Sequence, residues 1–149
     1  MHAIDIRTVL LARHAQHVVL VHFPIALFVT AVAFDYVSHW TKNQALTSAA
    51  YFNLVPAAAS TVPVAITGLL AWHWALEGQK LKGTLLLHLL LACAASFLIC
   101  LVLWVHVQAR RHPDRRLPTY RLPLEAFAVV VVGLTGHLGG VLSGVTRPG

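Results

Sequence analysis

Charged residues are scarce in this sequence, and acidic residues are the scarcest. There are 11 lysines and arginines and 5 aspartates and glutamates, so that 11% of the 149 residues are charged, whereas about 25% is usual in soluble domains. Hydrophobic residues make up 58% of the chain. Because a small soluble protein exposes much surface for its volume, so few charges could not cover it. The shortage of charge therefore excludes an ordinary soluble domain and predicts an integral membrane protein.

Cysteine is also scarce, and neither cysteine belongs to a metal or haem attachment motif. Cys93 and Cys100 lie in one apolar stretch, and the sequence contains no CxxC and no CxxCH. This pattern excludes a zinc ribbon and covalently attached c-type haem. A P-loop, a dinucleotide-binding motif, a nucleophile elbow and a recognisable acid–base pair are lacking too. We therefore expect a membrane subunit without independent enzymatic activity.

Long apolar stretches, in contrast, fill most of the chain. A helix that crosses about 30 Å of hydrocarbon needs about 20 apolar residues. Short connections between such helices make successive helices antiparallel neighbours. The expected fold class is all-α: an integral membrane four-helix transmembrane bundle, a single domain over residues 1–149 in contact with membrane lipid. Its four predicted spans are residues 17–36, 51–76, 84–107 and 123–142.

The basic residues lie between the apolar stretches. In a soluble domain a net charge of +6 would suggest a nucleic-acid partner. Here anchoring at lipid headgroups explains the charge, and no nucleic-acid partner is expected. The dense cluster RRHPDRR at residues 110–116 favours a cytoplasmic position for its loop, so both termini are expected to be periplasmic. The terminal side carries Arg7, Arg13, Lys80, Lys82 and Arg147.

The histidines are the strongest chemical signal. The chain has 10 of them, and an ionisable residue within a span is by default a candidate for function. One lies within each predicted span: His22, His73, His88 and His137. Because alternate spans run in opposite directions, all four fall at similar depth in the half of the bilayer nearer the termini. Their shared depth predicts a common site.

Small residues lie beside two of these histidines. Residues three, four or seven apart share a helix face, and on this basis His137 shares its face with Gly133 and Gly140, while the face of His88 is also rich in small side chains. A flat macrocycle could fill such a space, and bis-histidine haem is a standard arrangement in helix bundles. We expect one or two haem b groups, with axial ligands from His22, His88 and His137 and with His73 as the fourth.

His17 competes with His22 as the ligand from the first span. It lies five residues earlier, about 140° round the helix, so the two histidines should not serve one iron. Second-shell hydrogen bonds should orient the ligand rings, and three threonines are close enough in sequence to provide them. These are Thr67, Thr84 and Thr135.

Two ionisable residues lie toward the opposite half of the bundle. Asp35 is near the C-terminal end of the first span, where an anion opposes the helix macrodipole. We therefore expect it to have a cationic partner, either Arg110 or Arg121. His106 is near the end of the third span and is expected to be interfacial.

Three sequence blocks resemble a bacterial membrane family, domain of unknown function 2231. They are HVVLVHFPIAL (residues 17–27) followed by Asp35, VPVAITGLLAW (62–72) and LTGHLGG (134–140); His88 matches a family histidine. The resemblance covers roughly residues 14–142, and the family's longer tail is shortened here. It implies a four-helix domain of the bacterial inner membrane. Because members occur fused to cytochrome-like or iron–sulfur domains, the resemblance also implies a role in electron transfer with a partner such as a cytochrome c or an iron–sulfur protein.

Together these patterns favour a haem-b-binding electron-transfer subunit of a larger respiratory or photosynthetic membrane complex. Two alternatives stay open at this point. One is a cofactor-free structural subunit that packs against partner helices through a glycine stripe, Gly136, Gly140 and Gly144. The other is binding of a chlorophyll-type pigment by the same histidines.

Overall fold

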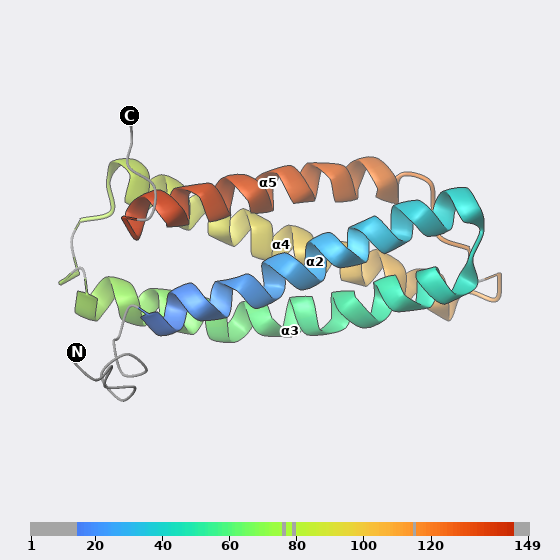
Figure 1. Ribbon diagram of the computed structural model, residues 1–149, viewed down its shortest axis with the longest axis horizontal. Coiled ribbons are helices and arrows are strands. Elements are labelled where there is room, and N and C mark those ends of the chain that lie inside the picture. Colours follow the sequence, from blue (N-terminus) through green and yellow to red (C-terminus); the bar gives the residue numbers. More distant parts are fainter. Residues whose placement is uncertain (1–14, 76, 79, 115, 145–149) are drawn as a thin grey trace, which may run out of the picture.

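Four long helices make up the part of the chain that the structure describes, residues 15–144 without residues 76, 79 and 115. The computed structural model contains α2 (Ala15–Thr41), α3 (Gln44–Ala75), α4 (Gly83–Arg111) and α5 (Arg121–Leu142). All four are long and apolar enough to cross a membrane. They lie side by side and alternate in direction (Figure 1). The prediction of an all-α four-helix membrane bundle is confirmed.

The helices extend beyond the predicted spans, most clearly at the turn between α2 and α3. Only Lys42 and Asn43 separate these helices, and Lys42 adopts a positive φ of 57°. The side chain of Asn43 accepts a hydrogen bond of 2.9 Å from the backbone N–H of Ala45. Such a bond satisfies one of the unpaired donors at a helix start. Residues 44–50, which include the polar Gln44, Thr47 and Ser48, therefore join α3, although hydropathy alone excluded them from the span.

The two ends of the bundle differ in the segments that they contain. The start of α2, the connection between α3 and α4 and the end of α5 lie together, and we call this the terminal end (Figure 1). The turn between α2 and α3 and the loop between α4 and α5 form the opposite, loop end. Arg7, Arg13 and Arg147, which the sequence analysis assigned to the terminal side, lie outside the described residues.

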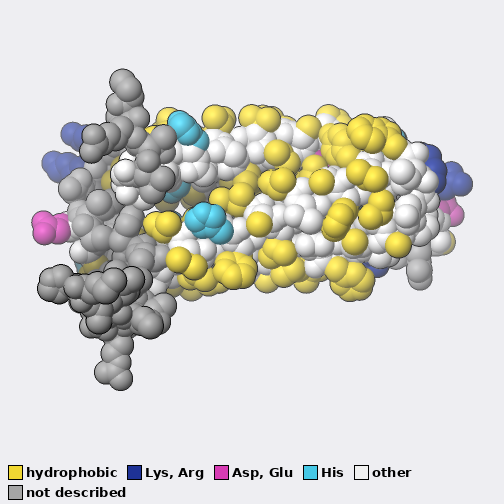
Figure 2. Space-filling view, in the orientation of Figure 1, with side chains coloured by type: hydrophobic (Ala, Val, Ile, Leu, Met, Phe, Trp, Pro, Cys, Tyr) yellow, Lys and Arg dark blue, Asp and Glu magenta, His cyan; other side chains and the backbone are white. Residues whose placement is uncertain are grey.

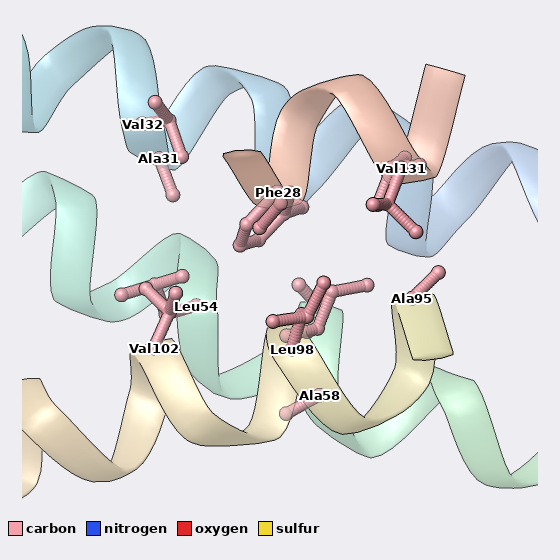
Figure 3. Close-up of a cluster of buried hydrophobic side chains, with 13 residues drawn as sticks. Phe28, Ala31, Val32, Leu54, Ala58, Ala95, Leu98, Val102 and Val131 are labelled. Carbon is pink, nitrogen blue, oxygen red and sulfur yellow. The ribbon is translucent and has the colours of Figure 1, made fainter. Parts of the chain in front are cut away.

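The hydrophobic core occupies the half of the bundle nearer the loop end, and Figure 3 shows its side chains in close-up. This loop-end half comprises residues 26–41, 44–63, 95–111 and 121–132; the terminal half comprises residues 15–25, 64–75, 83–94 and 133–142. The core cluster consists of Phe28, Ala31, Val32, Leu54, Ala57, Ala58, Ala95, Leu98, Ile99, Val102, Ala128, Val131 and Val132. In the terminal half, only Pro24 and Ala71 are buried among the side chains that the structure describes.

The outer surface agrees with a membrane setting. Hydrophobic side chains cover the middle of the face drawn in Figure 2, whereas Lys, Arg and acidic side chains gather at its two ends. Histidine side chains lie toward the terminal end of the same face. In Figure 1 the pair α2–α3 and the pair α4–α5 diverge toward the terminal end, where the core is absent.

Candidate functional site

The four histidines predicted to form a site lie in the terminal half, as the alternation of the helices requires. His22 is near the start of α2, His73 near the end of α3, His88 near the start of α4 and His137 near the end of α5. The antiparallel order of the helices brings these four segments to the same end (Figure 1). Shared depth, however, does not decide which way each side chain points.

His22 and His137 point away from the interior of the bundle. Both are exposed, and nine residues turn a helix by about 180°. Buried Ala31 is nine residues after His22, and buried Ala128 is nine residues before His137. Each histidine is therefore on the side of its helix opposite the core. The Nδ1 of His22 donates a hydrogen bond of 2.7 Å to the backbone carbonyl of Val18 on the same helix.

His73 also lies on an outer face, and Gly133, one of the two glycines expected beside His137, faces open space. His73 is exposed and shares its face with Leu69, which is 56% exposed. A Cβ added at Gly133 would meet no atom within 4 Å. Gly140 is partly buried, and its carbonyl accepts a hydrogen bond of 3.0 Å from Ser143. Within one chain the structure therefore does not bring His22, His73 and His137 together.

His88 is the member of the predicted set that faces the interior. It is half-buried, and its Nδ1 is buried with no hydrogen-bond partner among the described residues. The ring packs against α5 at Gly139, where an added Cβ would lie 3.3 Å from the His88 Cε1. Such a distance is tighter than ordinary van der Waals contact, so the absence of a side chain at Gly139 permits the close approach.

The close approach of α5 to another helix thus occurs beside the predicted glycine stripe. A Cβ at Gly136 would lie 3.6 Å from Ile25 Cδ1, which is ordinary contact. Gly144 follows the helix with a φ of 75° and would meet no atom within 4 Å. Among the α5 glycines whose surroundings the structure describes, the close approach is at Gly139, next to the expected Gly140.

His17 is the second inward-facing histidine of the terminal half. It lies 14 residues before buried Ala31, which places the two within about 40° on α2. Its Nδ1 is 3.1 Å from the Thr67 hydroxyl of α3. Because that hydroxyl donates its proton to the Pro63 carbonyl at 2.9 Å, it accepts from the histidine N–H. A Cβ at Gly68 would lie 3.0 Å from His17 Cε1, so His17 packs on Gly68 as His88 packs on Gly139.

The loop-end half contains a second group of ionisable side chains, all of them buried. Arg121 of α5 donates a hydrogen bond through its Nε to Asp35 of α2, so the expected cationic partner of Asp35 is Arg121. His106 of α4 lies 3.1 Å through its Nε2 from Glu125 of α5. The expectation that His106 is interfacial is wrong: it is 1% exposed, because it lies on the core face of α4 and pairs with Glu125.

These four side chains form one cluster, which we call the polar quartet. Ligand atoms of Asp35, His106 and Glu125 all lie within 4.8 Å of one another. Asp35 Oδ1 and Glu125 Oε2 are buried and accept no hydrogen bond from any residue that the structure describes. Sequence reasoning missed Glu125 and the acid–base pair that it forms. The available signal was its position inside a predicted span, where a carboxylate is expensive and usually functional.

The two halves therefore offer different chemistry. The terminal half presents two inward imidazoles, on α2 and α4, in a region with little buried side-chain packing. The loop-end half presents a carboxylate pair, an imidazole and a guanidinium inside a packed core. Imidazole alone suits a haem iron or another transition metal, whereas a cluster of carboxylates and histidine suits protons or hard cations.

Comparisons with known proteins support the membrane assignment. The model of a family described as predicted membrane protein, DUF2231, matches residues 13–147. No curated protein and no solved structure matches the chain. Since the match spans nearly the whole sequence and all four helices, the chain belongs to the DUF2231 family of predicted membrane proteins.

Proposed function

We propose that this protein is a haem-b-binding electron-transfer subunit of a membrane complex, with the haem in the terminal half and His17 and His88 as its axial ligands. The observation that carries the proposal is the buried Nδ1 of His88, which has no hydrogen-bond partner among the described residues. A buried polar nitrogen is costly to leave unsatisfied. Coordination of a metal satisfies it, and neutral imidazole is a common iron ligand.

The arrangement of the helices supports this pair of ligands. Each of α2 and α4 packs against both α3 and α5, so α2 and α4 are diagonal across the bundle. Imidazoles on facing helices of a bundle can bind the two sides of a cofactor in its interior. On α4 and α5 no residue in the ranges 83–94 and 133–142 is buried. Side chains are therefore packed less densely against one another here than in the loop-end half, where the core lies.

The surroundings of His17 also suit a ligand. The Thr67 hydroxyl accepts the Nδ1 proton of His17, which fixes the tautomer and orients the ring. Lys80 and Lys82, exposed near the terminal end, offer cations for the anionic propionates. When bound, the haem supplies a one-electron redox centre. The chain holds and orients it, and the apolar helices keep water away.

The orientation of the other histidines changes the ligand set expected from the sequence. His22, His73 and His137 lie on outer faces, where they would meet lipid or a partner subunit rather than a haem inside this chain. Ligation by these three residues remains a prediction without support from their geometry. The partner, such as a cytochrome c or an iron–sulfur protein on the periplasmic side of the bacterial inner membrane, is part of the proposal.

An absorption spectrum of the purified protein tests the proposal. We expect a Soret band and sharp α bands in the reduced protein. Replacing His88 or His17 with Ala should abolish or shift these bands, because each change removes an axial nitrogen. Two matched changes on outer faces should leave the spectrum intact. They are His22→Ala, on the same helix as His17, and His137→Ala, on α5 next to the helix of His88.

Three outcomes would contradict the proposal. If no haem copurifies with the intact protein, the cofactor-free structural subunit takes its place. A red absorption band in place of the Soret and α bands would indicate a chlorophyll-type pigment. Loss of the haem bands in His22→Ala or His137→Ala, but not in His88→Ala, would move the site to the outer surface.

A further inference from the structure

The polar quartet lies outside the proposed haem site and has an unbalanced charge. Asp35 and Glu125 contribute two negative charges, and Arg121 contributes one positive charge because arginine is not deprotonated in proteins. With neutral His106 the cluster therefore carries a net charge of −1. All four residues are at most 4% exposed. An uncompensated charge in such a place is strongly unfavourable.

We propose that the polar quartet is a proton-binding site that exchanges one proton with water at the loop end only. A single proton brings the net charge to zero. Asp35 Oδ1 and Glu125 Oε2 supply two buried oxygens that accept no hydrogen bond from the described residues, and the His106 ring supplies a nitrogen beside Glu125. A divalent cation would instead leave a net charge of +1 next to Arg121, which disfavours a metal as the occupant.

A pocket connects the quartet to the loop end. It has a volume of about 310 Å³ and is lined by Gln44, Thr47, Ser48, His106, Ala109, Arg110 and Leu117. Such a volume holds several water molecules, and the amide and hydroxyl side chains of α3 can bond to them. Because His106 lines the pocket and also contacts Glu125, it can take a proton from water and pass it inward. Imidazole suits this role because it has two ring nitrogens.

The path does not continue toward the terminal end. The buried layer next to the quartet is the hydrophobic core, whose largest fully buried side chains include Phe28, Leu54 and Val102. These side chains offer no group that could carry a proton. The site is therefore one-sided, an acceptor of protons rather than a channel.

Other charged and titratable groups face the quartet. On α2 the Tyr36 hydroxyl donates a hydrogen bond of 2.6 Å to the Leu122 carbonyl. On α4 the Arg110 guanidinium lines the pocket, and its centre lies 3.9 Å above the Tyr51 ring. The lining residues of α3 are uncharged. Tyrosine and arginine keep their protons near neutral pH, so the exchangeable proton belongs to His106, Glu125 and Asp35.

Infrared spectroscopy of the full chain in lipid nanodiscs tests this proposal without reference to haem. We expect a protonated-carboxyl band that grows as the pH falls and shifts when the water is replaced by D₂O. Glu125→Gln should lose this band together with one titrating proton per chain. The control Asp114→Asn, which removes an exposed carboxyl at the same end, should keep the band of the buried carboxyl and lose only the proton that Asp114 itself binds.

A second pair of variants keeps the test decisive if Glu125→Gln fails to fold. Ser48→Phe should fill the pocket, and His106→Gln should remove the group that carries the proton. Both should slow the deuterium shift of the carboxyl band relative to wild type. A band that does not change with pH, or an unchanged exchange rate in both variants, would overturn the proposal. Stoichiometric binding of Zn²⁺ or Mn²⁺ that Glu125→Gln abolishes would also overturn it in favour of a metal site.

Discussion

The loop-end half and the terminal half of this bundle are built from the same four helices but are stabilised differently. The loop-end half contains the hydrophobic core and pairs its buried charges across α2, α4 and α5. In the terminal half few side chains are buried, and two histidines pack against glycines of a neighbouring helix. The comparison teaches that depth in the membrane alone does not define a site, because packing decides which polar side chains face inward.

The two halves also contribute differently: the loop-end half is expected to provide most of the stability, and the terminal half contains the proposed haem site. A packed hydrophobic core and two buried ion pairs join the helices in the loop-end half, so this half should tolerate few changes. The terminal half has fewer buried side chains, so a smaller side chain there should cost less stability, and it contains the two histidines of the proposed haem site. The predictions below compare matched changes in the two halves.

The largest effect is expected for the buried ion pair. Arg121→Met leaves Asp35 without its guanidinium partner, and breaking one partner of a buried pair typically costs about 3–5 kcal/mol. The exposed Arg116→Met, at the same end of the bundle, should change stability by less than about 0.5 kcal/mol. Unfolding of both variants in detergent micelles by denaturant measures the difference.

The double variant Asp35→Leu/Arg121→Met sharpens this result. Replacing both partners by apolar side chains removes the unpaired charge, so much of the lost stability should return. If Arg121→Met is as stable as Arg116→Met, the buried charges contribute little, and the two halves do not differ in the way described.

A smaller effect is expected from loss of apolar side chains. Leu54 is 1% exposed within the core, and Leu→Ala in a packed core costs about 2–5 kcal/mol. Leu87 of α4 in the terminal half is 50% exposed, so Leu87→Ala should cost less than about 1 kcal/mol. The unfolding free energies of the two variants in the haem-free protein provide the measurement. Equal costs would mean that the terminal half is packed as well as the loop-end half.

The sequence allowed the fold to be predicted because membrane helices need long apolar stretches and this chain has four. Their ends were predicted too short, since Gln44, Thr47 and Ser48 are polar yet helical. The residue numbers also predicted which helix carries each histidine and how far along that helix the histidine lies. The family resemblance found in three sequence blocks agrees with the match over residues 13–147.

The side of its helix on which each histidine lies could not be predicted from the sequence in the same way. The stretch around His22 is apolar on every side, so hydropathy does not distinguish its outer face from its inner face. His17 and His22 are related by about 140°, and the structure turns His17 toward the core. The pairing of His106 with Glu125 joins two helices across the loop between α4 and α5. Such contacts depend on how each helix is rotated about its own axis, and the sequence of a single span does not determine this rotation.

The smallest effect, and the finest test of the terminal half, concerns two glycines of α5. Alanine favours a helix over glycine by about 1 kcal/mol. At Gly133 an added Cβ meets open space, so Gly133→Ala should stabilise the protein by up to about that amount. At Gly139 the Cβ would lie 3.3 Å from His88 Cε1, so the ring must move by a few tenths of an ångström. Gly139→Ala should therefore show none of this gain.

The same pair of variants also reports on the proposed haem. Because the His88 ring must shift in Gly139→Ala, its axial nitrogen moves and the α band of the reduced protein should shift or broaden. In Gly133→Ala the band should stay at its wild-type position. Thermal unfolding and the reduced-minus-oxidised spectrum of both variants, measured in one detergent, provide the two readouts. A stability gain in Gly139→Ala equal to that in Gly133→Ala, with an unchanged spectrum, would show that the contact between His88 and Gly139 constrains neither the fold nor the iron.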